Sequence, residues 1–253
     1  MKETQYYNKD FFTSAQVDAE SSAKEIVPIL DKLFSPKSVI DIGCGTGSWL
    51  KVWKDITGVQ DILGVEGPYI PKEVIEVPVE KVILQDLKLP LNINQKFDLA
   101  MSLEVAEHLP ETDSDNFVEK LTSLSDVIFF SAAIIGQEGT YHINEQMPDY
   151  WAKKFEKRGY VAVDYLRPLV WGKDDKVQWW YQQNILLYIK KETLSQYAVL
   201  EPFIVHRKES LLRVHPWLYL YKHSELNKTR TVVGYIRWRL YPVKLFFKKL
   251  IKK

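Results

Sequence analysis

Four residues in the middle of the chain carry side chains that can bind a metal ion or move a proton. Glu104, Glu107 and His108 are spaced i, i+3 and i+4, so on a helix they would project from one face. His142 follows in the next stretch that is expected to border the same crevice. Two carboxylates and two imidazoles suit an octahedral site for Mg²⁺ or Mn²⁺, with positions left for substrate oxygens.

Two other interpretations of these residues stand beside the metal site. In a metal-free enzyme, His108 or His142 acts as the general base and the carboxylates orient it. In a structural interpretation, Glu104 and His108 pack around a cofactor and Glu107 is a solvated helix residue. The residue pattern leaves all three open.

A glycine-rich turn precedes these residues in the chain. Gly43, Gly45 and Gly47 alternate directly after the β-branched run 38–42, so the backbone can turn sharply and approach a ligand. The helix expected next points its free N–H groups inward. Asp41, just before the turn, can accept from its amides or hold a bound ammonium group through water. The pattern predicts a nucleotide-sized pocket.

Acidic residues follow at the ends of the next two predicted strands. Glu66 can take both hydroxyls of a ribose, and Asp86 can accept from an adenine amino group, with Leu87 beside it. A glycine turn alone is also typical of nicotinamide-binding Rossmann domains, which remain the alternative. The acid before the turn and the acidic residues at both later strand ends distinguish this pattern from a glycine turn alone.

The positioning elements follow from the hydrophobic pattern. A capped helix is expected from Ser21 to Ser35, and a helix that opens after the fourth strand should carry the acid and histidine set. The alternation of strand-like runs with helical stretches predicts βαβ units and a largely parallel sheet. Further helices are expected at 49–55 and 147–157, and strands at 38–42, 61–65, 81–84, 97–101, 126–130, 160–163 and 184–188.

These motifs together resemble the class I S-adenosylmethionine-dependent methyltransferases. The resemblance runs from VIDIGCGTG through GVEG and QDL to FDLAMSLEVAEHLP and covers roughly residues 20–190. It implies an α/β, Rossmann-like sheet of seven strands with the last strand antiparallel and helices on both faces. It also implies a cofactor site formed by Asp41, Gly43, Gly45, Gly47, Glu66, Asp86, Leu87 and Glu104.

A finer resemblance concerns the acceptor. The ExxEH motif with a later histidine is similar to metal-assisted O-methyltransferases of small-RNA 3′ ends and of ubiquinone synthesis, in which adjacent hydroxyls contact the ion. The stretch FFSAAIIGQEGTYHINEQMPDYWAKKFEKRGY, with DYLRPLVW and WWYQQNILLY, resembles a bacterial subgroup associated with surface-glycan synthesis. This implies an O-methyltransferase that acts on a sugar hydroxyl, either free or lipid-linked. A quinol, a lipid, an RNA 3′ end and a non-catalytic binding role are the alternatives.

Five residues are predicted to bind the acceptor. Aromatic faces stack on the C–H faces of sugar rings, which favours Trp171 and Trp179, although core packing is their alternative role. The full set is Tyr7, Asn144, Glu145, Trp171 and Trp179.

The ends of the chain differ in composition from its middle. We expect an N-terminal lid over 1–20, the methyltransferase domain over 21–190 and a C-terminal extension over 191–253. No signal segment and no apolar run of membrane-spanning length is present, so a cytoplasmic protein is expected. Cys44 is the single cysteine, which excludes an intrachain disulfide or a CxxC site.

Positive charge is concentrated at the C-terminal end of the chain. Residues 230–253 hold eight Lys or Arg and no acid, so within a net charge of +1 the rest of the chain carries −7. That acidic body gives no reason to expect a nucleic-acid groove. The apolar stripe and basic face after Pro242 suit an anionic membrane surface, or a helix docked on its own domain or on a second subunit of a homo-oligomer.

Overall fold

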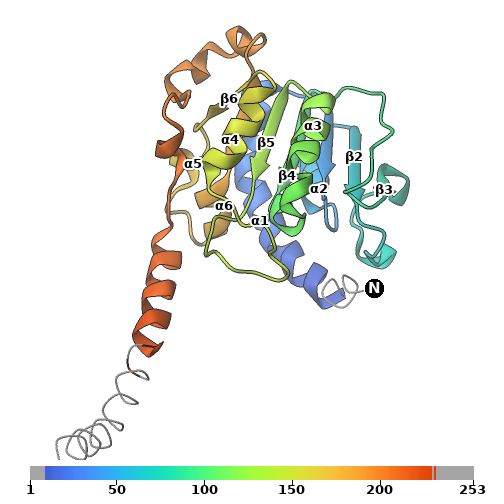
Figure 1. Ribbon diagram of the computed structural model, residues 1–253. Coiled ribbons are helices and arrows are strands. Elements are labelled where there is room, and N and C mark those ends of the chain that lie inside the picture. Colours follow the sequence, from blue (N-terminus) through green and yellow to red (C-terminus); the bar gives the residue numbers. More distant parts are fainter. Residues whose placement is uncertain (1–8, 230, 232–253) are drawn as a thin grey trace, which may run out of the picture. The chain divides into compact units, whose positions relative to one another are not determined.

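The computed structural model describes residues 9–229 and 231 and contains a sheet of seven strands in the order β3-β2-β1-β4-β5-β7-β6 (Figure 1). β1 to β5 are parallel, and β7 runs antiparallel to both β5 and β6. The predicted sheet with its antiparallel last strand is therefore confirmed. The strands are β1 Ser38–Ile42, β2 Asp61–Glu66, β3 Val82–Leu84, β4 Leu99–Leu103, β5 Val127–Ser131, β6 Tyr160–Val163 and β7 Leu186–Lys190.

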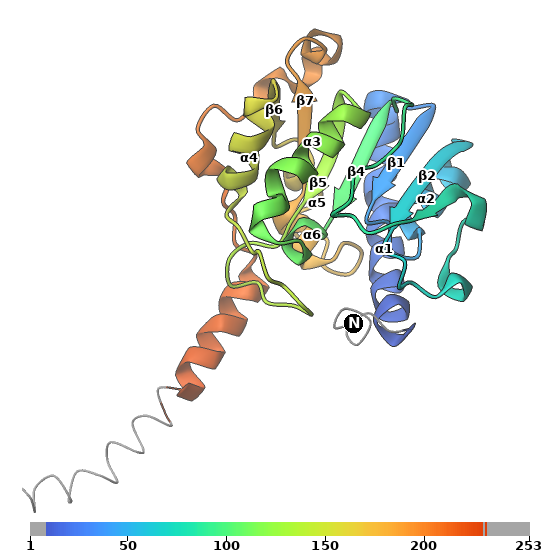
Figure 2. The same cartoon turned by 45° about the vertical axis from the view of Figure 1, so that its right-hand side comes forward.

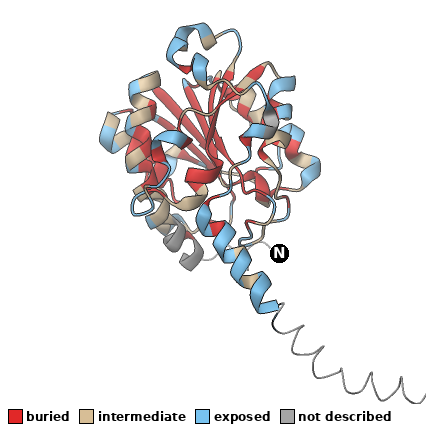
Figure 3. Ribbon diagram, turned by 90° about the vertical axis from the view of Figure 1, so that its left-hand side faces the viewer, coloured by how far each residue is buried: buried red, intermediate tan, exposed pale blue. Residues whose placement is uncertain are grey.

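Helices cover both faces of the sheet. α1 and α2 pack on one face through Ile26, Leu30 and Leu50, and α3 and α4 pack on the other through Phe117 and Phe155 (Figures 1 and 2). The centre of the sheet is accordingly buried (Figure 3). β1, β4 and β5 are buried at every position. The helices are α1 Lys9–Phe34, α2 Ser48–Val52 with a π-helical turn Trp53–Thr57, α3 Ser114–Leu124, α4 Pro148–Lys157, α5 Arg167–Val170 and α6 Trp179–Asn184.

The first helix starts earlier than its sequence predicts. α1 begins at Lys9, so Ser21 and Ser22 lie inside it and the predicted N-cap is wrong. The Ser21 hydroxyl donates instead to the carbonyl of Lys176, and the extra turns are held by the buried Phe12, which packs with Ile70. Residues 9–20 of the predicted lid are thus helical, and Tyr7 lies outside the described residues.

Residues beyond β7 extend the sheet's own unit. The chain divides after Arg213 into two compact units, and the second contains a helix over 216–229. Within the first unit, the buried Arg167 donates to the carbonyl of Leu211, and Arg213 pairs with Asp164 at 2.6 Å. The segment 191–213 therefore packs with the sheet, and the basic tail from 230 lies outside the described residues apart from Thr231. No helix in the described part of the chain is long and apolar enough to cross a membrane.

Candidate active site

The glycine turn after β1 needs glycine for two different reasons. Gly43, Gly45 and Gly47 all have positive φ, at 81°, 54° and 81°. A Cβ on Gly43 would lie 2.5 Å from Val105, so this position is closed by packing. A Cβ on Gly45 would meet nothing within 4 Å, so the space in front of Gly45 is open to a ligand.

Glu66 links the end of β2 to this turn. Its buried carboxylate accepts the N–H of Gly45 and the N–H of Gly67, each at 2.7 Å. Burial raises the pKa of Glu66, and these two amides oppose the rise. Each carboxylate oxygen keeps further acceptor capacity, which is what the predicted contact with two ribose hydroxyls requires.

The loop after β3 carries the predicted adenine contacts. Asp86 is partly exposed, and its carboxylate accepts the backbone N–H of Lys88 at 2.9 Å. Leu87 is buried, and its carbonyl accepts from the Lys120 ammonium group on α3. Sequence reasoning missed Lys120, because nothing in its local pattern shows that α3 reaches this loop.

Glu76 is another residue beside the glycine turn that sequence reasoning missed. Glu76 accepts the Ser48 hydroxyl at 2.6 Å and the Lys51 ammonium at 3.0 Å. Its backbone N–H donates to the carbonyl of Thr46 at 2.8 Å. The segment between β2 and β3 is thereby fastened to the start of α2, beside the glycine turn.

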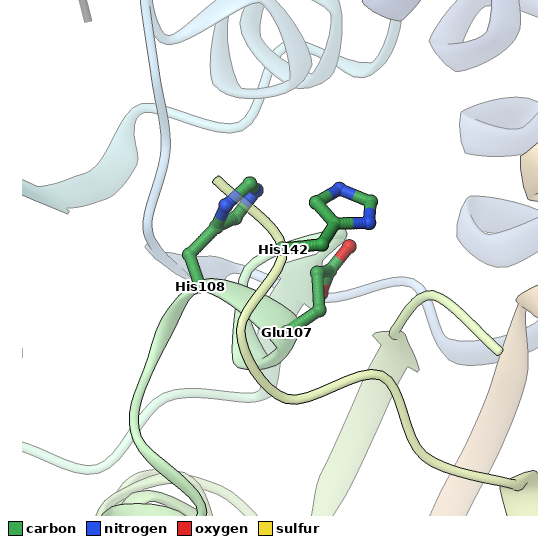
Figure 4. Close-up of side chains that lie close together, drawn as sticks. All are labelled: Glu107, His108 and His142. Carbon is green, nitrogen blue, oxygen red and sulfur yellow. The ribbon is translucent and has the colours of Figure 1, made fainter. Parts of the chain in front are cut away.

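The residues after β4 form a compact acid and histidine cluster without the predicted helix. Glu107 and His108 lie in the 3₁₀ turn Ala106–His108, ahead of α3, so the expected α-helical face is wrong. Ligand atoms of Glu107, His108 and His142 nevertheless lie within 4.8 Å of one another (Figure 4). Three of the four predicted metal ligands are therefore brought together.

Glu104 is directed to a different set of partners. Its φ of 55° is in the left-handed region, which re-aims its side chain relative to Glu107. The carboxylate accepts from the Gln137 amide at 2.8 Å and from the Asn184 amide at 3.1 Å. Glu104 is therefore not in the cluster of Glu107, His108 and His142. Burial raises the pKa of Glu104, and the two amide donors oppose the rise.

Glu107 is the most unusual residue of the cluster. Its side chain is 0% exposed, and neither carboxylate oxygen has a hydrogen-bond partner within the described residues. Burial, followed by the charge of Glu104, raises the pKa of Glu107 well above its ordinary value. A buried and unpaired carboxylate is costly unless a proton or a cation compensates it, so this environment fits a bound cation.

Both imidazoles are oriented through one ring nitrogen. Nδ1 of His142 donates to the Glu145 carboxylate at 2.9 Å, and Nδ1 of His108 donates to the Tyr141 carbonyl at 3.3 Å. Burial, and then His142, lowers the pKa of His108 to about 4, so this ring is neutral at physiological pH. An imidazole whose second ring nitrogen is held in this way is typical of a metal ligand.

Asn144 and Glu145, which are predicted to bind the acceptor, make hydrogen bonds inside the protein. Glu145 accepts the backbone N–H groups of Gly136 at 2.7 Å and Glu138 at 2.6 Å, in addition to His142. Asn144 is buried and donates to the Ser114 hydroxyl at 3.2 Å. Both side chains therefore fix the loop that carries His142.

The aromatic residues between β6 and β7 divide into two groups. Tyr181 is buried with its ring 5.4 Å from Trp49, and Trp180 packs against the core. Trp171 is exposed, and Trp179 is partly buried with its ring edge-on to Trp180 at 5.6 Å. Trp171 and Trp179 thus keep surface that an acceptor can contact.

This fold and cofactor crevice define a class I S-adenosylmethionine-dependent methyltransferase. The chain belongs to the family described as "Methyltransferase domain", whose model matches residues 15–185. A comparison with curated proteins finds no match.

The chain is also similar to solved methyltransferase structures at low sequence identity. A putative O-methyltransferase from Nostoc punctiforme is 12% identical with a TM-score of 0.53, covering 71% of this chain and 59% of its own. The methyltransferase domain of bacterial CtHen1 is 21% identical with a TM-score of 0.47, covering 66% and 96%. The magnesium protoporphyrin IX methyltransferase of Synechocystis with bound SAH is 18% identical with a TM-score of 0.47, covering 69% and 84%.

Cofactor binding should release a proton from Asp41 near neutral pH. Burial, and then the charge of Glu66, raises the pKa of Asp41 to about 8, so the ligand-free carboxyl is mostly protonated there. The positive charge of S-adenosylmethionine favours the carboxylate, so affinity should rise with pH and level off above about 8. Calorimetry in buffers of different ionisation enthalpy measures the release. Asp41→Asn should lose it, and an unchanged release in that variant would assign the proton elsewhere.

Proposed function

We propose that this methyltransferase transfers the methyl group to a sugar hydroxyl of a cell-surface glycan, of O-antigen or capsule type, with help from a metal ion. The observation that carries the metal assignment is the fully buried Glu107 carboxylate, unpaired within the described residues and clustered with His108 and His142. Mg²⁺ or Mn²⁺ is the proposed ion, because oxygen and imidazole ligands suit both.

The chain's own residues have distinct roles in this proposal. Glu107, His108 and His142 would hold the ion, which would supply Lewis acidity that lowers the pKa of the acceptor hydroxyl. Glu145 keeps the His142 ring in place, and the Gly45 turn holds the cofactor at the adjacent strand ends. The acceptor hydroxyl gives its proton to solvent, and its oxygen attacks the methyl carbon in line as the bond from that carbon to sulfur breaks, giving S-adenosylhomocysteine, a methyl ether and the released proton.

A metal-free mechanism is favoured by one specific contact. The His142–Glu145 pair, at 2.9 Å, has the geometry of a general base with an orienting carboxylate. Such an enzyme would act on another small molecule, a quinol, a lipid or an RNA 3′ end. Loss of activity on chelation separates the two mechanisms.

The glycan acceptor rests on the resemblance in sequence and on the aromatic surface. The proposed enzyme works in the cytoplasm on a free or lipid-linked glycan, where S-adenosylmethionine is available. Mass spectrometry of surface glycans from cells with and without the protein tests this directly. Loss of one methyl ether in the deleted strain is the expected result, and identical glycans would refute the glycan assignment but leave the methyltransferase class intact.

Replacing the exposed aromatic residues should affect acceptor binding more than cofactor binding. Trp171→Ala or Trp179→Ala removes a ring that can stack on a sugar, so KM for the acceptor should rise about tenfold while KM for the cofactor stays constant. Steady-state kinetics with each substrate varied provides the measurement. Val199→Ala, which shortens an exposed apolar side chain of the first unit, is the control. Equal changes in both KM values, or unfolding, would indicate a core role.

A further inference from the structure

The helix over residues 216–229 exposes an unusual amount of apolar surface. Tyr219 is 63% exposed, Leu220 is 62% exposed and Leu226 is 58% exposed. Trp217 and Tyr221 are stacked with ring centroids 5.4 Å apart, and both are also exposed. Large apolar side chains gathered on one short helix mark an interaction surface, because single exposed residues are normally scattered.

Charge identifies the kind of partner. The second unit, from Val214 onward, contains ten Lys or Arg and one acid, so it carries +9 while the rest of the chain carries −8 within a total of +1. Two of the cations, Lys222 and Lys228, lie on the helix itself, and the Lys222 ammonium is 5.6 Å from the centre of the Tyr221 ring. An anionic surface is electrostatically complementary to this unit and not to the remainder.

The residue types favour a lipid surface over a protein surface. Trp and Tyr are enriched where hydrocarbon meets lipid headgroups, because their rings are apolar and carry one polar group. Lys side chains can reach headgroup phosphates while their stems lie along apolar surface. We infer that the helix over 216–229 binds the anionic surface of a membrane, with Tyr219, Leu220 and Leu226 entering the interface.

This inference goes beyond the methyltransferase chemistry and does not rest on the acceptor. The sequence predicts a membrane contact for the basic tail, and the inference adds the helix over 216–229 to that contact. Membrane binding of this kind would place the enzyme at a bilayer without a spanning helix.

Sedimentation of the full chain with lipid vesicles tests the inference. The protein should bind phosphatidylcholine vesicles that contain phosphatidylglycerol, should bind vesicles of phosphatidylcholine alone far more weakly, and should dissociate as salt is raised. The triple variant Tyr219→Ser, Leu220→Ser, Leu226→Ser should lose affinity by about tenfold or more. Lys222→Glu with Lys228→Glu should also weaken binding, and this pair leaves the apolar residues in place.

The control variant replaces three exposed apolar residues with serine outside the helix over 216–229. Val17→Ser, Ile56→Ser and Val199→Ser replace three exposed apolar residues of the first unit, and vesicle binding should be unaffected. All variants should bind S-adenosylmethionine as the parent does, which shows that they are folded. Unchanged vesicle binding by the Tyr219 triple variant would overturn the inference. So would a parent that forms dimers without binding vesicles and a triple variant that is monomeric, because the helix would then be a subunit interface.

Discussion

Chelation should abolish turnover, and added Mg²⁺ or Mn²⁺ should restore it. Glu107, His108 and His142 are the three predicted ligands that the structure brings together, and the buried Glu107 carboxylate has no side-chain hydrogen-bond partner within the described residues. Because a metal ion supplies several kcal/mol of transition-state stabilisation, its removal should lower the rate by about a thousandfold. The measurement is S-adenosylhomocysteine formation before and after chelation.

Single substitutions sharpen this test. Glu107→Gln keeps the shape of the side chain but removes its charge, so both Mn²⁺ binding and turnover should be lost while the fold and cofactor affinity remain. Glu111→Gln makes the same change at an exposed residue nearby and should have no effect. Glu145→Gln weakens the support of His142 and should reduce metal affinity by about tenfold to a hundredfold.

Two results would contradict the metal assignment. Full activity after thorough chelation would exclude an essential ion. An active Glu107→Gln variant that fails to bind Mn²⁺ would show that the ion is incidental to turnover. Either result would favour the His142–Glu145 pair as general base.

The sheet and the glycine turn could be predicted because their signals are local. β1 and β6 have the predicted bounds, since short β-branched runs flanked by turn residues define a buried strand. Positive φ values at Gly43, Gly45 and Gly47 follow from glycine itself. These features need only neighbouring residues.

The errors concern contacts between distant residues. The predicted N-cap at Ser21 is wrong because α1 continues toward its N-terminus to Phe12, which packs against Ile70 in the loop after β2. The local sequence pattern around Ser21 carries no sign of this distant contact. The left-handed conformation of Glu104 has no mark in its sequence, and it separates this acid from the Glu107 cluster. The role of Glu145 likewise depends on a folded loop that returns to His142.

Gly45→Val should remove most of the affinity for S-adenosylmethionine. Its φ of 54° disfavours a β-branched residue, and the new side chain would occupy the open space that the cofactor needs. A decrease of at least about a hundredfold is expected, which corresponds to about 2.7 kcal/mol. Glu66→Ala should also weaken binding strongly, because it removes both the predicted ribose contact and the acceptor of the Gly45 amide.

Gly58→Val separates backbone strain from loss of the binding site. Gly58 has φ of 79° and, like Gly45, no atom within 4 Å of an added Cβ, but it lies at the end of the turn Trp53–Thr57, away from the glycine-rich turn in the chain. Both valine variants should lower the free energy of unfolding, because valine is strained at positive φ. Only Gly45→Val should also lose cofactor affinity in calorimetry. If Gly45→Val and Glu66→Ala bind S-adenosylmethionine as tightly as Gly58→Val does, the cofactor does not lie at this turn.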